Sequence, residues 1–328
     1  MRKKTKIKIT IGVLVIVIAF LSICNCITFN NLGENNISLK VQDEINLKSP
    51  KKSGYWNLQF IHIDGNWSHT VGNYTWCSGD GSWANPYIIE NVTIDASSSP
   101  TGSGILINNS KNDYFIINNC NVYNAGSGYN DSGIKLENTN NGTIIGNKCS
   151  HNGRFGIFLY NHCKNNTISG NTANENYNYG IYLFDDCDNN TISGNTVNDN
   201  DYSGIHLYWY CSNYIISNNS VNYNEWDGIH LDISGYGIIS GNTANYNRYG
   251  IHLYSSHSNI ISGNILIGND ECIFELECEE NIFENNTCIK GEFPSMLIIA
   301  IIYTAGGIGL SVVIIVLLLK KLRVSERT

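Results

Sequence analysis

Residues 180–195 read GIYLFDDCDNNTISGN, and residues 204–219, one period later, read GIHLYWYCSNYIISNN. Each copy contains a glycine, a short alternating strand, a polar turn, a second short strand and an asparagine. A unit of this length cannot bury its apolar face alone, so successive copies must stack on one another. The opening glycine recurs every 22 to 29 residues, at Gly104, Gly133, Gly156, Gly180, Gly204, Gly228 and Gly250, and Cys272 replaces it in the last copy.

The alternation within each copy decides which residues form the core. In residues 204–208, the Ile and Leu side chains face one side and the His and Tyr side chains face the other, because successive side chains of a strand point to opposite faces. The period also fits a leucine-rich repeat, but the dense leucine pattern and the helical segment of that repeat are absent. The sequence therefore predicts an all-β fold, a parallel β-helix solenoid of about eight or nine rungs over residues 88–290.

The asparagine that closes each copy forms a second regular column. In a solenoid whose strands lie about 4.8 Å apart, equivalent side chains stand directly above one another. Stacked amides donate and accept hydrogen bonds along such a column, so we expect a structural ladder inside the turns. Its members are Asn147, Asn171, Asn195, Asn219, Asn242 and Asn264.

These copies resemble the NosD-type parallel β-helix repeats of the pectin-lyase-like superfamily, over roughly residues 79–290. Residues 79–89, GDGSWANPYII, are also similar to the start of such domains, where a glycine-rich turn and an Asn-Pro-Tyr lead into the first rung. The resemblance implies a right-handed solenoid, of a kind common in surface proteins. Related repeats occur in polysaccharide lyases, alginate epimerases and copper-site maturation proteins, so the fold does not choose among functions.

Two apolar segments flank the repeats. Residues 11–23 are apolar and follow five cations, so residues 1–28 are expected to be a signal peptide or an N-terminal anchor. Residues 296–319 carry no charge and, at about 36 Å as a helix, are long enough to cross a bilayer, which predicts a transmembrane helix. Positive charges follow at once, so the short basic tail, residues 320–328, is expected in the cytoplasm and the repeats outside the cell.

Two shorter segments precede the repeats. Residues 29–53 are polar and contain the sequence Ser-Pro-Lys-Lys near their end, which is typical of a flexible linker. Residues 54–87 contain four tryptophans, and the open end of a solenoid needs a cover over its core. We therefore expect residues 54–87 to form an N-terminal cap that leads into the first rung.

The charge of the middle of the chain limits its partners. Residues 29–295 contain 11 Lys and Arg against 27 Asp and Glu, a net charge of −16, whereas the whole chain carries −8. A surface this acidic repels phosphate backbones, so nucleic acid is not an expected partner. Cations and neutral polar ligands suit it better.

The outward positions of the strands carry the candidate binding site. The third position of the Gly-Ile-x-Leu strand holds an aromatic or imidazole ring on six successive rungs, and a tyrosine-rich column lies beside it. Such rings suit contact with a carbohydrate or with another surface protein. Plain stacking of rings between rungs would also account for them. The candidate binding residues are His206, Tyr208, Trp209, His230, Asp232, His252 and Tyr254.

Part of the same set is a candidate metal site. Imidazoles on neighbouring strands converge on one copper or zinc ion in many sites, and a carboxylate completes or orients the ligand shell. The candidate ligands are His206, His230, His252 and Asp232. Two acidic turns, residues 185–188 and 199–204, are weaker candidates for calcium, with an ordinary Asx-rich turn as the alternative.

Cysteines and glycosylation sequons are also placed by the repeat. Cys163, Cys187 and Cys211 occupy equivalent positions, where the rung spacing allows one disulfide and where buried thiols are equally consistent. Eleven Asn-x-Ser/Thr sequons favour a glycoprotein if the repeats lie outside the cell. They include Asn66, Asn73, Asn91, Asn165, Asn189 and Asn285.

These features together predict a membrane-anchored, non-enzymatic surface protein that recognises a carbohydrate or another surface protein. Paired catalytic carboxylates are absent from any one strand face, and no certain cofactor is predicted. Two alternatives remain: a polysaccharide-acting enzyme of the lyase or epimerase type, and metal handling, as the NosD resemblance implies.

Overall fold

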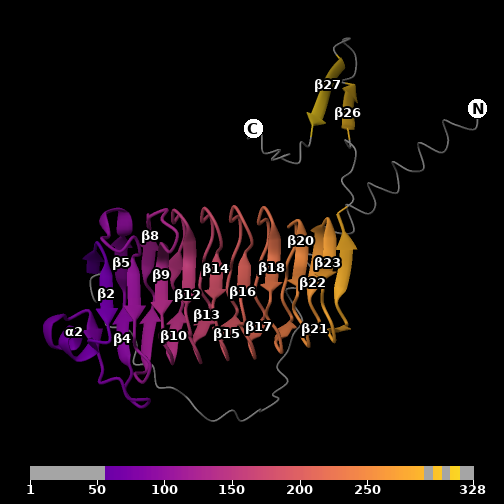
Figure 1. The fold of residues 1–328 in the computed structure, drawn as a ribbon. Coiled ribbons are helices and arrows are strands. Elements are labelled where there is room, and N and C mark those ends of the chain that lie inside the picture. The colour runs from indigo at the N-terminus through magenta and orange to yellow at the C-terminus, as the bar shows by residue number, and fades with distance from the viewer. Residues whose placement is uncertain (1–55, 292–297, 305–310, 318–328) are drawn as a thin grey trace, which may run out of the picture. The chain divides into compact units, whose positions relative to one another are not determined.

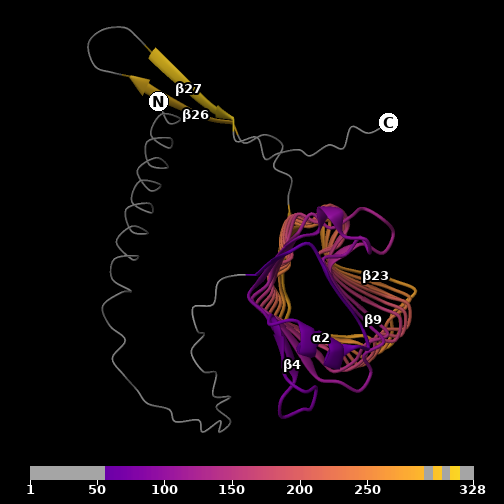
Figure 2. The same ribbon diagram turned by 90° about the vertical axis from the view of Figure 1, so that its left-hand side faces the viewer.

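The computed structural model describes residues 56–291, 298–304 and 311–317. The predicted signal segment at 1–28, the linker at 29–53 and the basic tail at 320–328 lie outside the described residues, and the description of the predicted cap begins at Trp56. Residues 56–291 form a right-handed solenoid of about eight turns, in which each turn lies on the one before it (Figures 1 and 2). The predicted all-β fold of stacked parallel rungs is therefore confirmed.

The solenoid has three sides of stacked, mostly parallel strands, which Figure 2 shows in cross-section; the short strand Cys77–Ser78 pairs antiparallel with its neighbour. The nine-stranded sheet contains β2 (Ile61–Asp64), β6 (Ile105–Asn108), β9 (Ser132–Glu137), β12 (Phe155–Tyr160), β14 (Ile181–Phe184), β16 (Ile205–Tyr208), β18 (Asp227–Asp232), β20 (Tyr249–Tyr254) and β23 (Glu271–Leu276). The ten-stranded sheet contains β3 (Cys77–Ser78), β4 (Tyr87–Glu90), β7 (Phe115–Asn118), β10 (Gly142–Ile145), β13 (Thr167–Ser169), β15 (Thr191–Ser193), β17 (Ile215–Ser217), β19 (Ile238–Ser240), β21 (Ile260–Ser262) and β24 (Ile282–Glu284).

The third side is the least regular. It consists of β1 (Trp56–Leu58), β5 (Val92–Asp95), β8 (Asn121–Tyr123) and β11 (Lys148–Cys149) at one end and of β22 (Ile265–Asn269) and β25 (Thr287–Lys290) at the other. Single bridges through Thr172, Thr196, Ser220 and Thr243 connect the two groups. A short 3-10 helix, η1 (Ala96–Ser98), follows β5.

The strand register places like residues over like residues. Ile181 pairs with Ile205 and Leu183 with Leu207, and the same register continues on the following rungs. These Ile and Leu side chains are fully buried and form the core. Burial of each contributes roughly 1.5–3 kcal/mol. The glycine that opens each copy is required by this packing, since a Cβ at Gly204 would lie 2.3 Å from Cγ1 of Val221.

The asparagine column forms a hydrogen-bonded ladder inside the solenoid. Oδ1 of Asn195 accepts hydrogen bonds from the backbone N–H and the amide of Asn171, at 2.9 and 3.0 Å. The amide of Asn195 donates to the carbonyl of Ile168 and to Oδ1 of Asn219, both at 2.9 Å. The same pattern links Asn147 to Asn171 and continues to Asn264. Buried backbone groups at the turns thereby find partners on the neighbouring rung.

A second ladder runs parallel to the first and was not predicted. It is formed by Asn152, Asn176, Asn200, Asn224, Asn247 and Asn269, which are all buried. Each member follows a member of the first ladder by five residues, so the sequence did contain its signal. Asn200 lies inside the acidic turn at 199–204, and its buried amide makes that turn part of the scaffold.

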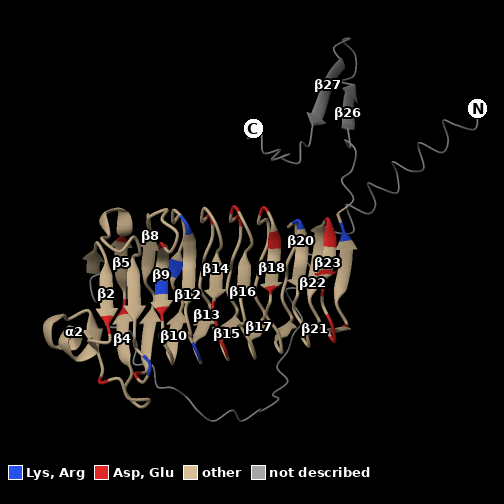
Figure 3. Ribbon diagram, in the orientation of Figure 1, with Lys and Arg blue, Asp and Glu red and all other residues tan. Residues whose placement is uncertain are grey.

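The other acidic turn is held by one ion pair and by a contact between a carboxylate and an imidazole, both between rungs. Asp188 accepts from Nζ of Lys164 at 2.6 Å, and a carboxylate oxygen of Asp186 lies 3.3 Å from Nδ1 of His162. Acidic residues lie at many turns along the solenoid (Figure 3). The sequon residues Asn165 and Asn189 are exposed in the turns of this region.

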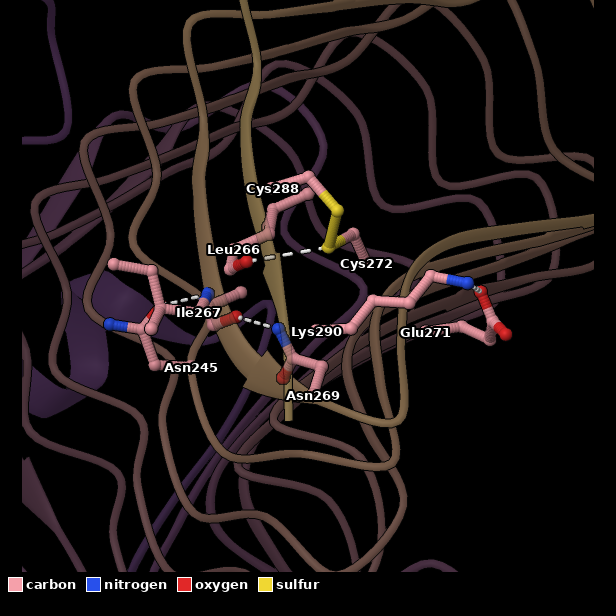
Figure 4. The surroundings of a disulfide bond; sticks show 9 residues. Asn245, Leu266, Ile267, Asn269, Glu271, Cys272, Cys288 and Lys290 are labelled. Carbon is pink, nitrogen blue, oxygen red and sulfur yellow. Dashed lines mark hydrogen bonds and ion pairs between the residues drawn. A yellow bond between two sulfur atoms is a disulfide. The ribbon is translucent and has the colours of Figure 1, made fainter. Parts of the chain in front are cut away.

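Among the described residues, the cysteines comprise six buried thiols, the partly exposed thiol of Cys278 and one disulfide. Cys163, Cys187 and Cys211 are free and fully buried. Of the two alternatives that the sequence left open at these positions, the structure therefore shows the buried thiols and not a disulfide. Burial raises the pKa of Cys187 well above its ordinary value. The disulfide joins Cys272 and Cys288, on the last rungs (Figure 4), and was not predicted. Cys288 lies outside the cysteine column, so the repeat pattern gave no sign of this pair.

The two ends of the solenoid differ. At the N-terminal end, α2 (Trp67–Asn73) lies within the segment predicted as a cap, and the indole of Trp67 stacks on Tyr87 at 4.8 Å and contacts Phe115. At the C-terminal end, the last rung leaves Phe283 and Ile289 substantially exposed.

The described parts of residues 296–319, which are residues 298–304 and 311–317, differ from the prediction of one helix. β26 (Ile298–Thr304) and β27 (Ser311–Leu317) form an antiparallel pair, and residues 305–310 are not described. Both strands are rich in Ile and Val, whose branched side chains favour extended backbone. Within the described residues, no helix has the length and hydropathy needed to cross a bilayer. The membrane anchor stays a prediction from the hydropathy of the sequence.

The ladder gives the first testable prediction. Asn195→Ala removes the acceptor of Asn171 N–H and the donor to Ile168, so it is expected to lower the free energy of unfolding by about 3 kcal/mol, since each unsatisfied buried group costs about 1–3 kcal/mol. Urea denaturation of the full-length chain measures the change. The control Ser193→Ala, on the same rung and partly exposed, should change stability by less than about 0.5 kcal/mol. Equal effects of the two variants would contradict the structural role of the ladder.

Candidate functional site

One cleft on the outer face of the nine-stranded sheet is the candidate site. It has a volume of about 320 Å³ and extends over β12, β14, β16 and β18. The loop between β8 and β9 contributes to its wall. Its lining residues are Tyr129, Asn130, Arg154, Phe155, Phe158, Asn178, Tyr179, Tyr182, Phe184, His206, Tyr208, His230 and Asp232.

A column of stacked rings forms part of the cleft. The strand register places Phe158, Tyr182, His206, His230 and His252 on successive rungs. The ring centroids of His206 and His230 are 4.4 Å apart and those of His230 and His252 are 4.2 Å apart, with the planes of each pair within 7° of parallel. This separation follows from the rung spacing of about 4.8 Å.

The outward column is more enclosed than the alternation predicts. His206 lies between Tyr182 and His230, and the edge of Tyr179 contacts it at 4.7 Å. Only 5% of His206 is exposed, although its side chain is on the face opposite the Ile and Leu core. Neighbouring rings supply the cover, and the expected outer face is a packed aromatic layer with a cleft in it.

The structure brings together four of the seven predicted binding residues. His206, Tyr208, His230 and Asp232 line the cleft. The other three predicted residues do not line the cleft. Trp209 is 44% exposed in the turn after β16, and His252 and Tyr254 lie one rung beyond the cleft.

Unpaired polar atoms gather at this cleft. Among the residues that the structure describes, nine buried side-chain nitrogen or oxygen atoms have no hydrogen-bond partner, and seven of these belong to residues that line the cleft. They are Oδ1 of Asn130, Nε of Arg154, Oδ1 of Asn178, Nδ1 and Nε2 of His206, Nε2 of His230 and Oδ1 of Asp232. Buried polar groups are normally paired, so this concentration marks a place that a polar ligand would complete.

Asp227 is a site residue that the sequence reasoning missed. Its carboxylate is almost fully buried, and Oδ2 lies 3.0 Å from Nδ1 of His252 and 3.4 Å from Nδ1 of His230. Simple alternation from Ile229 puts Asp227 on the core side. However, Gly228 and Ile229 both face the core: a Cβ at Gly228 would lie 2.8 Å from Cβ of Ala244. The alternation of side chains is thus interrupted at Gly228. Asp227 therefore faces the histidines.

Burial sets the charge of the cleft. Desolvation lowers the pKa of His206 to about 3, and the nearby His252 lowers it further. Desolvation also holds the pKa of His230 well below its ordinary value. Both imidazoles are therefore neutral at pH 7, with a lone pair free to accept. Burial raises the pKa of the Asp232 carboxyl, and His252 opposes that shift.

Arg154 supplies the cation of the cleft. Its guanidinium carbon lies 5.0 Å from the ring centroid of Tyr129 and 5.1 Å from that of Phe155. These contacts hold the guanidinium at the rim by cation–π attraction. The second arginine of the solenoid, Arg248, contacts Trp226 and Tyr249 in the same manner but does not line the cleft.

The family assignment agrees with this architecture. Residues 51–221 match the family described as "Right handed beta helix region", which spans more than half of the chain, so the chain belongs to this family. Residues 209–304 also match the family described as "Periplasmic copper-binding protein (NosD)". The predicted resemblance to NosD-type repeats is confirmed for that region. Among curated protein sequences, none matches the chain significantly.

Solved structures with limited similarity to this chain include two epimerases and a bacteriophage tailspike protein. The periplasmic alginate epimerase AlgG is 18% identical with a TM-score of 0.46, and the match covers 71% of this chain and 68% of that chain. The A-module of the mannuronan C-5 epimerase AlgE4 of Azotobacter vinelandii is 11% identical with a TM-score of 0.42, with coverages of 71% and 87%. Tailspike protein 2 of bacteriophage CBA120 is 14% identical with a TM-score of 0.47, with coverages of 62% and 34%. These likenesses concern the fold alone.

The unpaired atoms of His206 give the second prediction. His206→Phe places there the ring that Phe158 carries in the same column and removes two unsatisfied buried nitrogens, so it is expected to raise the free energy of unfolding by about 1–2 kcal/mol. Denaturation of the full-length chain in urea at pH 7.5, with chelator present, is the measurement. His62→Phe is the matched control, since His62 begins the same column but is exposed and bonded to Asn108. A loss of stability in His206→Phe would show that His206 is kept for packing.

Proposed function

We propose that the cleft over β12, β14, β16 and β18 binds a carbohydrate at the cell surface. The observation that carries the proposal is the coincidence of aromatic walls and seven unpaired polar atoms in one cleft. Ring faces pack against the apolar faces of sugar rings, and unpaired donors and acceptors bond the hydroxyls. Both features are needed to indicate a sugar. An apolar ligand would pack on the aromatic walls but leave the polar atoms of the cleft unpaired, and a small ion would pair with polar atoms but make no use of the aromatic walls.

The mixture of donors and acceptors supports a polyhydroxylated ligand. The Nε–H of Arg154 donates, whereas Oδ1 of Asn130 and Oδ1 of Asn178 accept. A sugar hydroxyl does both, so a carbohydrate suits a cleft whose walls mix donors and acceptors. The volume of about 320 Å³ is at the lower end of the range for small-molecule sites and suits a short stretch of a glycan chain.

The electrostatics agree with a neutral or weakly charged glycan. The imidazoles of His206 and His230 are neutral, so Arg154 and Asp232 are the charged groups that line the cleft. They lie on rungs three steps apart, which is about 14 Å along the solenoid at the usual strand spacing. A ligand that extends along the axis meets a cation at one end and an acid at the other. The acidic surface outside the cleft argues against nucleic acid.

Glycan binding is tested directly. We expect the full-length chain, purified in detergent, to bind at least one oligosaccharide on an array of neutral and acidic glycans. Tyr208→Ala should weaken that binding at least about tenfold, equivalent to about 1.4 kcal/mol, by calorimetry with the array's best binder. Tyr177→Ala is the control, because Tyr177 is an exposed aromatic residue that does not line the cleft. An empty array, or equal losses in the two variants, would refute the proposal.

The location at a membrane is a separate proposal that rests on the sequence. The uncharged segment 296–319, followed by Lys320, Lys321 and Arg323, would anchor the chain with the solenoid outside and the tail in the cytoplasm. The sequons of the solenoid agree with that side of the membrane.

Truncation tests the anchor. A chain that ends at residue 293 should move from the membrane pellet to the soluble fraction after a carbonate wash, because it loses the apolar segment. A control chain that ends at residue 323 keeps the segment and should stay in the pellet. Retention of the shorter chain in the pellet would place the anchor elsewhere and overturn this part of the proposal.

A further inference from the structure

We propose that His206, His230 and Asp232 bind one transition-metal ion of the zinc or copper(II) class at the floor of the cleft, with Asp227 as the carboxylate that orients His230. The inference goes beyond carbohydrate binding and does not depend on it.

The first support is the state of the three ligand groups. His206, His230 and Asp232 each offer a nitrogen or oxygen atom, and these atoms lie within 4.8 Å of one another. All three residues carry a buried side-chain atom without a hydrogen-bond partner. His206 is only 5% exposed with both ring nitrogens unpaired, which is costly unless something else occupies them. A bound cation supplies that partner for all three residues at once.

The second support is Asp227, which organises the histidines from behind. Its Oδ2 lies 3.0 Å from Nδ1 of His252 and 3.4 Å from Nδ1 of His230, so the carboxylate favours the tautomer with the hydrogen on each Nδ1. Nε2 of His230 is then the lone-pair nitrogen, and it is the atom that has no partner. A carboxylate that fixes the tautomer of a histidine from the far side of the ring is the usual outer partner of a metal-binding imidazole.

This arrangement revises the ligand set expected from the sequence. His252 stacks on His230 and shares Asp227, but it does not belong to the group that includes Asp232. A second group is Asp227, His230 and His252, in which Oδ2 of the carboxylate already contacts both Nδ1 atoms, while Oδ1 has no partner among the described residues. We assign His206, His230 and Asp232 as the ligands because all three line the cleft with an unpaired atom, whereas Asp227 and His252 do not line it and form the supporting layer.

Binding requires a small movement of His206. The rings of His206 and His230 are 4.4 Å apart and nearly parallel, so their in-plane lone pairs run side by side. Zinc–nitrogen bonds are about 2.0–2.1 Å long, so one ring must turn for both to reach the ion. A turn of His206 breaks its ring contacts with Tyr182 and Tyr179 but no hydrogen bond, because neither of its nitrogens makes one. Asp227 holds His230 in place.

The donor set selects the class of metal. Two imidazoles and one carboxylate suit zinc or copper(II), whereas calcium and magnesium prefer oxygen ligands alone. Three protein ligands would leave one coordination position of a tetrahedral ion open. A water molecule or a hydroxyl of a bound ligand would occupy it.

The test is metal binding by the full-length chain, prepared in detergent without a polyhistidine tag and stripped with chelator. Titration with Zn²⁺ and with Cu²⁺ should show one site per chain, and X-ray absorption of the zinc form should show nitrogen and oxygen neighbours at about 2.0–2.1 Å without sulfur at about 2.3 Å. The sulfur criterion excludes binding by Cys278, a free thiol that is not fully buried. Ca²⁺ and Mg²⁺ should not compete.

Variants identify the ligands. His206→Ala, His230→Gln and Asp232→Asn should each lose the site, Asp227→Asn should weaken it by about 10- to 100-fold, and His252→Gln should weaken it less than Asp227→Asn. His162→Ala is the matched control, since His162 is an exposed imidazole beside Asp186 and should bind metal as the wild type does. Circular dichroism identifies any variant that fails to fold. The X-ray absorption spectrum of the wild-type zinc form tests the nature of the ligands without any variant. No stoichiometric binding, a sulfur neighbour, or loss of the site in His252→Gln but not in His206→Ala would overturn the proposal.

Discussion

Hydrogen bonding between consecutive rungs is the interaction on which the rest of this structure depends. The strands of each rung pair in parallel with those of the next, and the two asparagine ladders extend that pairing into the turns, where strand hydrogen bonds end. Because an amide both donates and accepts, one buried residue per turn satisfies the backbone groups above and below it. The ladders also fix the register, since a slip by one residue would break every bond in the column.

A fixed register forces every outward position into a column, and the cleft is a consequence. Once Phe158, Tyr182 and His206 stand over one another, their rings must stack at about the rung spacing. The column begins at the exposed His62, is buried from Leu106 to His206 and is partly exposed from His230 onward, and the cleft lies where Tyr179 and the loop containing Tyr129 stand beside it. The scaffold repeats, whereas the cleft exists only where these additional side chains enclose the sheet.

The unpaired polar atoms in the cleft lower the stability of the solenoid at this place. A phenylalanine or tyrosine at position 206 would continue the stack without unsatisfied nitrogens, as on the two preceding rungs. The chain instead has imidazoles and carboxylates there, in a layer where burial opposes their charge. A repeat protein tolerates such a cost locally, because its stability is distributed over many similar interfaces between rungs. Membership of the right-handed β-helix family fixes the scaffold and leaves the choice of ligand to these outer residues.

The sequence by itself determined the solenoid, its approximate rung number, the Ile and Leu core columns and the first asparagine ladder, because a period of about 23 residues constrains each of these locally. It also pointed to His206, His230 and Asp232. The tertiary structure alone decided that His62 is exposed and His206 is buried, although both occupy the same strand position. It also decided that Arg154 and Tyr129 enclose the cleft, that Asp227 turns outward at Gly228, and that Cys272 pairs with Cys288. The physical reason is that a repeat specifies which residues stack, whereas burial and pairing depend on neighbours that come from loops and corners outside the repeat pattern.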